Sequence, residues 1–258
     1  MIPSLYKDSN AVNIFSDAST IKINDIPLIC SGYVQVFQDK EINSETQIWA
    51  NCSSVFGELY AFYLGLNDIY TIAQYNIARN VDPNGFIYNI YTDSIFVKDA
   101  ISNWIFHWMK QAEQYRQMHT QDFQQFNCPP NLVTKGDTQV KYQQLFMNII
   151  NTILASRVYI NIYHIKAHKN HKNPKQVKEV RKKFAALNNV SLKEVNHDDI
   201  RHLMKWNDRI DKLTRNNLKT AMNDSKSREF YLQRQLFWPM TFFPNNLEQI
   251  YEFKRLVR

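Results

Sequence analysis

The sequence predicts an α/β fold with a mixed five-stranded sheet, and the spacing of its apolar residues supports this. Three β-like segments come first, at residues 11–17, 30–37 and 42–50, close enough in the chain for an antiparallel meander. An amphipathic helix over residues 53–73 and a dense run of β-formers at residues 86–91 follow. A strand, a helical crossover and a further strand imply a right-handed parallel connection, so the last two strands are expected to be parallel.

The remaining elements complete this order. A short helix is expected from Ser94, and longer helices are expected over residues 103–118 and 140–156. The segment RVYINIYH at residues 157–164 is expected to form the fifth strand. Residues 120–139 contain two prolines and a glycine, which favour a loop.

Length and composition favour one main domain. The chain has 258 residues, 44% of them hydrophobic, which is enough for one sizeable core with an appended part. We expect a main domain over residues 1–224, with an insertion at about 172–206, and a C-terminal extension over residues 225–258. The extension is rich in aromatic residues. It either packs against the core or docks to a replication protein.

Charge and cysteine usage narrow the class of protein. The net charge of +7 favours polyanionic partners. The three cysteines are scattered and form no C-x-x-C pair, so a reducing compartment is expected. No signal peptide and no run of about 18 apolar residues is visible, so we expect a cytoplasmic protein with no membrane contact.

Four acidic residues occupy positions from which they can converge. Asp17 lies near the end of the first strand, Glu58 in the first turns of the helix that follows the meander, and Asp93 directly after the fourth strand. Asp211 lies in NDRIDKLTRNNL, which is expected to be a late helix. Converging carboxylates repel one another and stay ionised only beside cations, and their hard oxygens suit Mg²⁺ or Mn²⁺. The alternative for each acid alone is a turn residue or a helix cap.

Four segments of the chain resemble, in order, the signature segments of type 1 ribonuclease H. They are IFSDAS, FGELYAFYLGL, IYTDSIFV and NDRIDKLTR, and the match covers roughly residues 11–220. The resemblance implies a ribonuclease H-like fold and an endonuclease that cuts the RNA strand of RNA/DNA hybrids, leaving 3′-hydroxyl and 5′-phosphate ends. It also implies two Mg²⁺ ions, which Mn²⁺ can replace. Asp17 would bridge both ions, Asp211 would complete one site, and Glu58 and Asp93 would complete the other.

A histidine extends the resemblance. The segment IYHIKAHKNH places His168 where the family carries a histidine in a loop after a strand, where it assists proton transfer or product release. Imidazole titrates near neutral pH and suits either task. The alternatives are a zinc site formed by His164, His168 and His171, or a merely basic loop.

One predicted helix is a candidate surface for nucleic acid. Residues 101–117 carry Trp104, Trp108 and Lys110, and they resemble the family's Trp-rich handle, which grips the DNA strand. Aromatic rings stack on bases or sugars while lysines meet phosphates. The alternative is that the two tryptophans, four residues apart, bury against the sheet.

A basic run is a second candidate surface. Its eight basic residues are Lys166, Lys169, Lys172, Lys175, Lys178, Arg181, Lys182 and Lys183. Such a run is usually a solvated face, but beside a nuclease site it favours phosphate binding. Lys166, Lys169 and Lys172 are the members closest in sequence to His168, and we expect them to bind nucleic acid.

Three departures from the family keep rival functions open. Ala18 stands where the family often has glycine, and Ser54, Val55 and Ile95 stand where polar side chains usually contact the 2′-hydroxyls of the substrate. The gap between the histidine and the last acid is also several times longer than usual. The rivals are a DNA nuclease of the resolvase or transposase kind and a non-catalytic nucleic-acid-binding module.

Overall fold

The computed structural model describes residues 10–118, 132–135, 140–166, 169–233 and 247–258. Within these residues one sheet has the strand order β3-β2-β1-β4-β5. The strands are β1 (Ala11–Ile23), β2 (Ile26–Phe37), β3 (Lys40–Ala50), β4 (Ile87–Thr92) and β5 (Ile160–His164). The first three strands pair antiparallel, whereas β4 pairs parallel to both β1 and β5. This confirms the predicted mixed sheet, which has the order and directions of a ribonuclease H-like fold.

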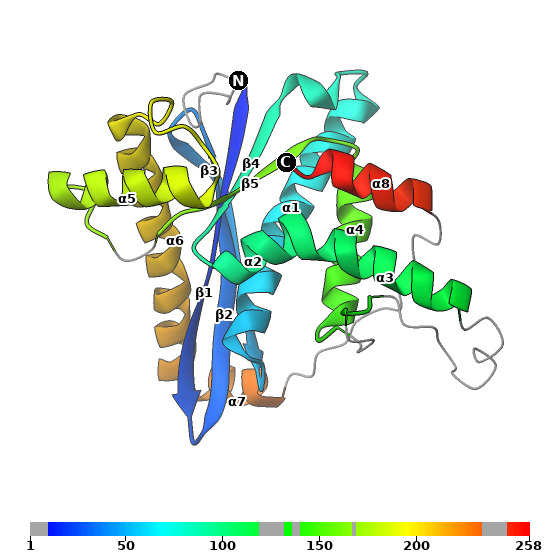
Figure 1. The fold of residues 1–258 in the computed structure, drawn as a ribbon. Helices are drawn as coiled ribbons and strands as arrows, with labels where there is room; N and C mark the ends of the chain where they lie inside the picture. The colour runs from blue at the N-terminus through cyan, green and yellow to red at the C-terminus, as the bar shows by residue number, and fades with distance from the viewer. Residues whose placement is uncertain (1–9, 119–131, 136–139, 167–168, 234–246) are drawn as a thin grey trace.

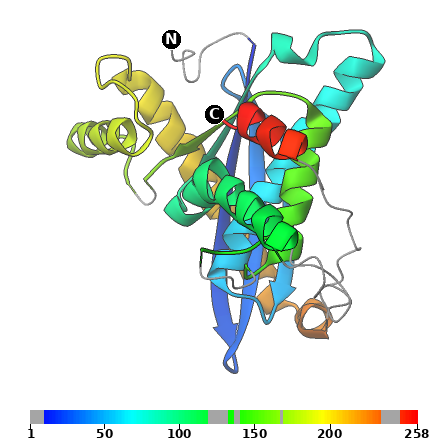
Figure 2. The same ribbon diagram turned by 45° about the vertical axis from the view of Figure 1, so that its right-hand side comes forward.

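Helices cover both faces of the sheet (Figure 1 and Figure 2). On one face lie α1 (Ser54–Ala78), α2 (Ile95–Asp99), α3 (Ile105–Met118), α4 (Gln143–Ser156) and α8 (Leu247–Leu256). On the other face lie α5 (Pro174–Leu187) and α6 (His197–Asn223), and α7 (Ser225–Gln233) then contacts β3. A 3₁₀ turn, Pro83–Gly85, precedes β4, and a π-helical turn, Ala100–Trp104, joins α2 to α3.

Strand β1 shows how the sequence builds these two layers. Successive side chains of a strand point to opposite faces, so Ile14 packs in the core beneath α1, whereas Phe15 packs in the core beneath α5 and α6. Phe15 stacks on Tyr91 with ring centroids 4.8 Å apart, and Tyr91 stacks on Tyr163 at 5.4 Å. One aromatic ladder therefore crosses β1, β4 and β5 on the α5 face.

The first two hairpins have shorter turns and longer strands than the sequence predicts. Strand β1 runs past Asp17 to Ile23 because Asn24 and Asp25 turn the chain with φ of 47° and 65°. Gln38 and Asp39 do the same between β2 and β3, with φ of 49° and 57°. Asparagine and aspartate tolerate this left-handed region, which suits two-residue hairpin turns. The predicted start of the fifth strand at residue 157 is wrong, since Arg157 takes a left-handed conformation (φ 56°) that ends α4.

The end of the chain packs into the core. Ile250, Phe253 and Leu256 of α8 are each 1% exposed and belong to the same core as α1 and α4. The amide of Arg258 donates to the carbonyl of Ile160 at 2.9 Å, which ties the chain end to β5. Residues 234–246, which hold half of the extension's aromatic residues, lie outside the described part. No described helix is both long enough and apolar enough to cross a membrane.

Helix α1 lies very close to the sheet because its inner face carries small residues. Gly57, Ala61 and Gly65 recur every four residues, and all three are buried. A Cβ atom added to Gly65 would lie 2.5 Å from Cγ2 of Ile14, a side chain with no exposed surface. The helix and the strand could move apart only by opening a gap in the core.

We expect Gly65→Ala to lower the free energy of unfolding by about 1–3 kcal/mol, because overpacking forces backbone shifts. Gly85→Ala is the matched control, since a Cβ there would meet no atom within 4 Å. Urea unfolding monitored by circular dichroism measures both variants. Equal midpoints for the two would show that the close approach of α1 is not a constraint.

Candidate active site

The parallel pairing of β1 and β4 brings two acids together. Ser16 of β1 pairs with Thr92 of β4, so Asp17 and Asp93 each follow this pair by one residue. Asp17 lies in the middle of β1 and not near its end, as the sequence suggested, but β4 stops at Thr92 and leaves room beside it. Asp17 is 4% exposed, and the amide of Ala18 donates to its Oδ1 at 2.7 Å.

Helix α1 supplies the third acid. Ser53 caps the helix by accepting from the amide of Phe56 at 3.2 Å, and its hydroxyl also contacts that of Tyr142. The hydroxyl of Ser31 on β2 donates to the carbonyl of Gly57 at 2.8 Å. A Cβ on Gly57 would collide with Ile29, so the absence of a side chain lets this turn rest on the sheet. Glu58 is the next residue and is thereby held over Asp17.

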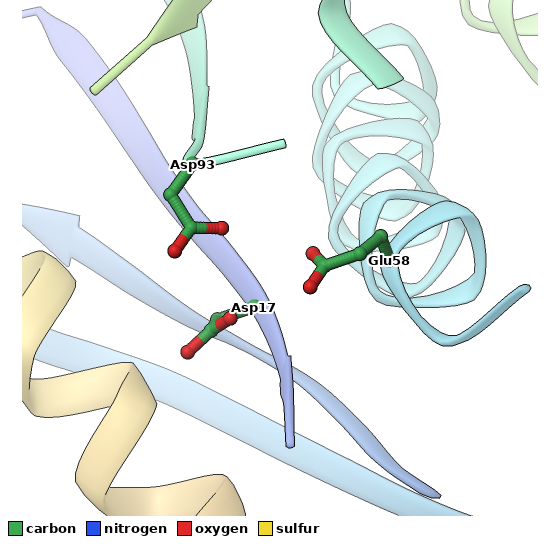
Figure 3. Close-up of side chains that lie close together, drawn as sticks. All are labelled: Asp17, Glu58 and Asp93. Carbon is green, nitrogen blue, oxygen red and sulfur yellow. The ribbon is translucent and has the colours of Figure 1, made fainter. Parts of the chain in front are cut away.

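Asp17, Glu58 and Asp93 form a compact cluster. One carboxylate oxygen from each lies within 4.8 Å of the other two, and the side chains point toward one another (Figure 3). Burial raises the pKa of Asp17 well above its ordinary value, and the carboxylates of Asp93 and Asp211 raise it further. Burial, Asp17 and Asp93 likewise raise the pKa of Glu58. Like charges held this close need a cation to remain ionised together.

The cluster has the donor set of a hard divalent cation. All its ligand atoms are carboxylate oxygens, which suit Mg²⁺ or Mn²⁺. The Oε2 atom of Glu58 is buried and has no hydrogen-bond partner among the described residues. A buried carboxylate oxygen is rarely left in this state, so the residues present fit a bound metal ion.

Asp211 lies beside the cluster. It lines the same cavity of about 420 Å³ as the other three acids, together with Arg215 and Lys219. Its side chain is mostly buried, and Oδ1 lies 2.8 Å from Nε of Arg215 one helical turn away. Hydrogen bonds to β1 and β3 help to hold α6 against the sheet. The Ser19 and Thr214 hydroxyls lie 2.9 Å apart, and Asn217 donates to Thr46 at 2.6 Å.

His164 supports the cluster in a way that the sequence did not reveal. It ends β5, is 8% exposed, and its Nε2 lies 3.0 Å from the carbonyl oxygen of Asp93. Burial lowers the pKa of His164, which favours a neutral ring that donates to this carbonyl. The Asn188 side chain accepts from the amide of His164 at 2.7 Å and donates to its carbonyl at 2.9 Å. The sequence suggests His164 only as a possible zinc ligand, and His168 lies outside the described residues.

The tryptophan segment combines the two interpretations that the sequence left open. Trp104 is 38% exposed, with its ring centroid 6.0 Å from that of Trp108. Trp108 is half-buried and packs edge-on against Phe146 of α4 at 5.3 Å. Lys110 lines a cavity of about 380 Å³ with both tryptophans. One tryptophan thus packs on the core, while the other is accessible to a ligand.

The basic run lies mainly on α5, and one acid organises part of it. The Glu179 carboxylate lies 3.0 Å from Lys166, 3.5 Å from Lys169 and 3.4 Å from Lys183. Hydrogen bonds from Lys166 first and then Lys183, with the charges of Lys166 and Lys169, hold the pKa of Glu179 at about 2. The exposed lysines of α5 are Lys175, Lys178, Lys182 and Lys183.

Comparison with known proteins finds similarity among solved structures. No protein-family model and no curated protein matches the chain. The foamy viral protease-reverse transcriptase in complex with an RNA/DNA hybrid is 15% identical, with a TM-score of 0.45, and the match covers 64% of this chain and 18% of that one. LC11-RNase H1, isolated from compost by a metagenomic approach, is 13% identical with a TM-score of 0.39, covering 69% and 97%. RNase H1 from the halophilic archaeon Halobacterium salinarum NRC-1 is 10% identical with a TM-score of 0.32, covering 60% and 86%.

The raised pKa values predict how stability depends on pH. A carboxyl group whose folded pKa is raised stabilises the fold below its unfolded pKa of about 4, and this contribution is lost as pH rises through the folded value. We therefore expect Asp17→Asn in chelator to raise the melting temperature at pH 8 by about 2–4 °C, which corresponds to about 1 kcal/mol in the free energy of unfolding. At pH 5 the increase should be smaller.

Thermal melts at both pH values measure this effect, with Asp25→Asn in the exposed first hairpin as the control. Mg²⁺ should raise the melting temperature of the wild-type protein more than that of Asp17→Asn. A lower melting temperature for Asp17→Asn than for the wild type at pH 8 in chelator would contradict the repulsion described above.

Proposed function

We propose that this protein is a metal-dependent endonuclease of the ribonuclease H type that hydrolyses the RNA strand of RNA/DNA hybrids. The observation that supports this most is the convergence of Asp17, Glu58 and Asp93 where β4 ends beside β1 in a ribonuclease H-like sheet. Asp211 lines the same cavity from α6. A surface that only bound polyanionic nucleic acid would gain nothing from crowding four carboxylates together.

The acids would hold two Mg²⁺ ions, or Mn²⁺ in their place. Asp17, Glu58 and Asp93 would hold one ion, and Asp17 together with Asp211 would hold the other. Ions bound there would lower the pKa of a water molecule and neutralise charge that develops on a phosphodiester. The products would carry 3′-hydroxyl and 5′-phosphate ends.

The chain itself positions these groups and attracts the substrate. Ser31 fixes the turn that carries Glu58, and His164 holds the backbone at Asp93. Arg215 orients the Asp211 carboxylate and adds positive charge to a cavity through which a phosphate must pass. For His168, the transfer of a proton or assistance to product release remains a proposal from the sequence.

A DNA nuclease is the second candidate because two expected contacts to 2′-hydroxyls are apolar. Val55 lies in the first turn of α1 and is packed against the core, while Ile95 begins α2 and is 48% exposed. Neither side chain can donate or accept a hydrogen bond. Cleavage of an RNA/DNA hybrid and of DNA of the same sequence separates the two functions.

Asp17→Asn and Asp93→Asn should each reduce hybrid cleavage in Mg²⁺ to below about one hundredth of the wild-type rate. Each change removes a ligand charge worth several kcal/mol in a metal-assisted step, and each 1.36 kcal/mol is tenfold in rate. Affinity for the hybrid should be unchanged or higher, since repulsion toward phosphate is relieved. Gel assays of cleavage and fluorescence anisotropy of binding measure the two effects, with Asp25→Asn as the control. Near-wild-type cleavage by either site variant would refute the assignment.

The exposed lysines of α5 should contribute to affinity through phosphates. We expect joint replacement of Lys175, Lys178, Lys182 and Lys183 by Gln to weaken binding and to flatten its salt dependence. Removing one lysine–phosphate interaction with a duplex reduces the slope of log affinity against log salt by about 0.9. Binding titrations in Ca²⁺ at several salt concentrations give the slope, and Lys226→Gln on α7 is the control. An unchanged slope would mean that this run is only a solvated face.

A further inference from the structure

A second cavity adjoins the acidic one on the α5 side of α6. Its volume is about 510 Å³, and it shares Asp211 and Arg215 with the acidic cavity, so the two meet at these side chains. Lys166 and residues 169–172, which follow β5, form one wall, and α6 forms the other. Its cationic lining residues are Lys166, Lys169, Lys172, Lys212 and Arg215, and Asn207 lies among them.

The second cavity is strongly cationic. Five lysine and arginine side chains line it against two aspartates. Both aspartates already form ion pairs within α6, since Lys212 lies 2.6 Å from Asp208 and Arg215 lies 2.8 Å from Asp211. The nearby carboxylate of Glu179 faces three lysines at once. Positive charge therefore remains in excess, which suits a phosphate group of a nucleic-acid backbone.

Asn207 lines the second cavity and carries an unsatisfied amide. It is 3% exposed, and its Oδ1 atom is buried with no hydrogen-bond partner among the described residues. A buried amide oxygen without a partner is costly and is uncommon in folded proteins. An amide offers an acceptor on one side and donors on the other, and a hydroxyl group can both donate and accept. A hydroxyl group therefore satisfies Asn207 in either orientation of the amide.

We propose that the second cavity holds a ribose–phosphate unit of the strand that is cleaved, with the phosphate against its lysines and the 2′-hydroxyl against Asn207. The inference rests on the proposed nuclease function and adds a means of recognising RNA. The strand whose phosphodiester lies at the acids has its neighbouring nucleotides within reach of a cavity that shares Asp211 and Arg215. Deoxyribose has no 2′-hydroxyl and would leave the Asn207 amide unsatisfied. Asn207 would thus supply discrimination that the apolar Val55 and Ile95 do not.

The test is a scan of single deoxyribonucleotides through the RNA strand of a hybrid, with binding measured in Ca²⁺ by fluorescence anisotropy. For the wild-type protein, one position should weaken binding by about two- to tenfold, the range for one hydrogen bond. Asn207→Ala should weaken binding of the all-RNA strand by the same factor and should be insensitive to deoxyribose at that position. Asn217→Ala is the matched control, because Asn217 lies on the same helix and bonds Thr46 outside this cavity.

The proposed contact between the phosphate and the lysines is tested separately. Lys172→Gln should weaken binding and reduce the salt slope by about 0.9, whereas the exposed Lys226→Gln should not. If Asn207→Ala does not fold, Asn207→Leu takes its place, since it keeps a branched shape and removes the unsatisfied group. A wild-type protein that is insensitive to deoxyribose at every position overturns the inference, even if hybrids are cleaved in Mg²⁺. A sensitive position that Asn207 variants leave unchanged overturns it as well. Loss of the proposed function would appear separately, as binding with this pattern but no cleavage in Mg²⁺.

Discussion

The close contact between α1 and the sheet is the constraint on which the candidate site depends. Glu58 is the only one of the three clustered acids that comes from a helix, and it reaches Asp17 because the backbone at Gly57 rests against Ile29 and Ser31. A side chain at Gly57 would lift the helix and carry the Glu58 carboxylate away. The larger side chains of α1 pack to the side instead, where Phe56 and Tyr60 stack with ring centroids 5.7 Å apart. Small residues facing the sheet thus give the site its geometry.

The charge of the clustered carboxylates is the second constraint on the candidate site. The fold places three carboxylates so that burial and mutual repulsion raise the pKa of Asp17 and Glu58. A bound cation would relieve this repulsion, so the arrangement suits a metal site. Two supports of these three acids are neutral donors, the amide of Ala18 and the ring of His164, which fix positions without cancelling the negative charge. The carboxylates are therefore held in place while their charge stays available to a metal ion.

Helix α6 separates an acidic cavity from a basic one. Asn207, Asp211 and Arg215 are spaced four residues apart and so lie along one face of the helix. Asp211 and Arg215 line both cavities, whereas Asn207 lines only the basic one. Helix α5 is fixed to the end of β5 through its C-cap residue Asn188 and to α2 through Lys98, whose ammonium group donates to the Leu187 carbonyl at 2.9 Å. Lys166, Lys169 and Lys172, which follow β5, line the side of the basic cavity opposite α6.

The sequence by itself determined the elements and the identity of the acids, because apolar periodicity is local and carboxylates that follow strands or begin helices mark a site without coordinates. It predicted the five strands, α1 and the four acids, including Glu58 near the start of its helix. It missed the two-residue hairpins at Asn24 and Gln38, since left-handed turns without glycine leave a weak signal. Only the tertiary structure decided that Asp17 lies level with the end of β4, that Ser31 and His164 support the acids, and that Asn207 is buried without a partner among the described residues. These facts depend on residues far apart in the chain, and their distances are set by the packing of strands and helices together.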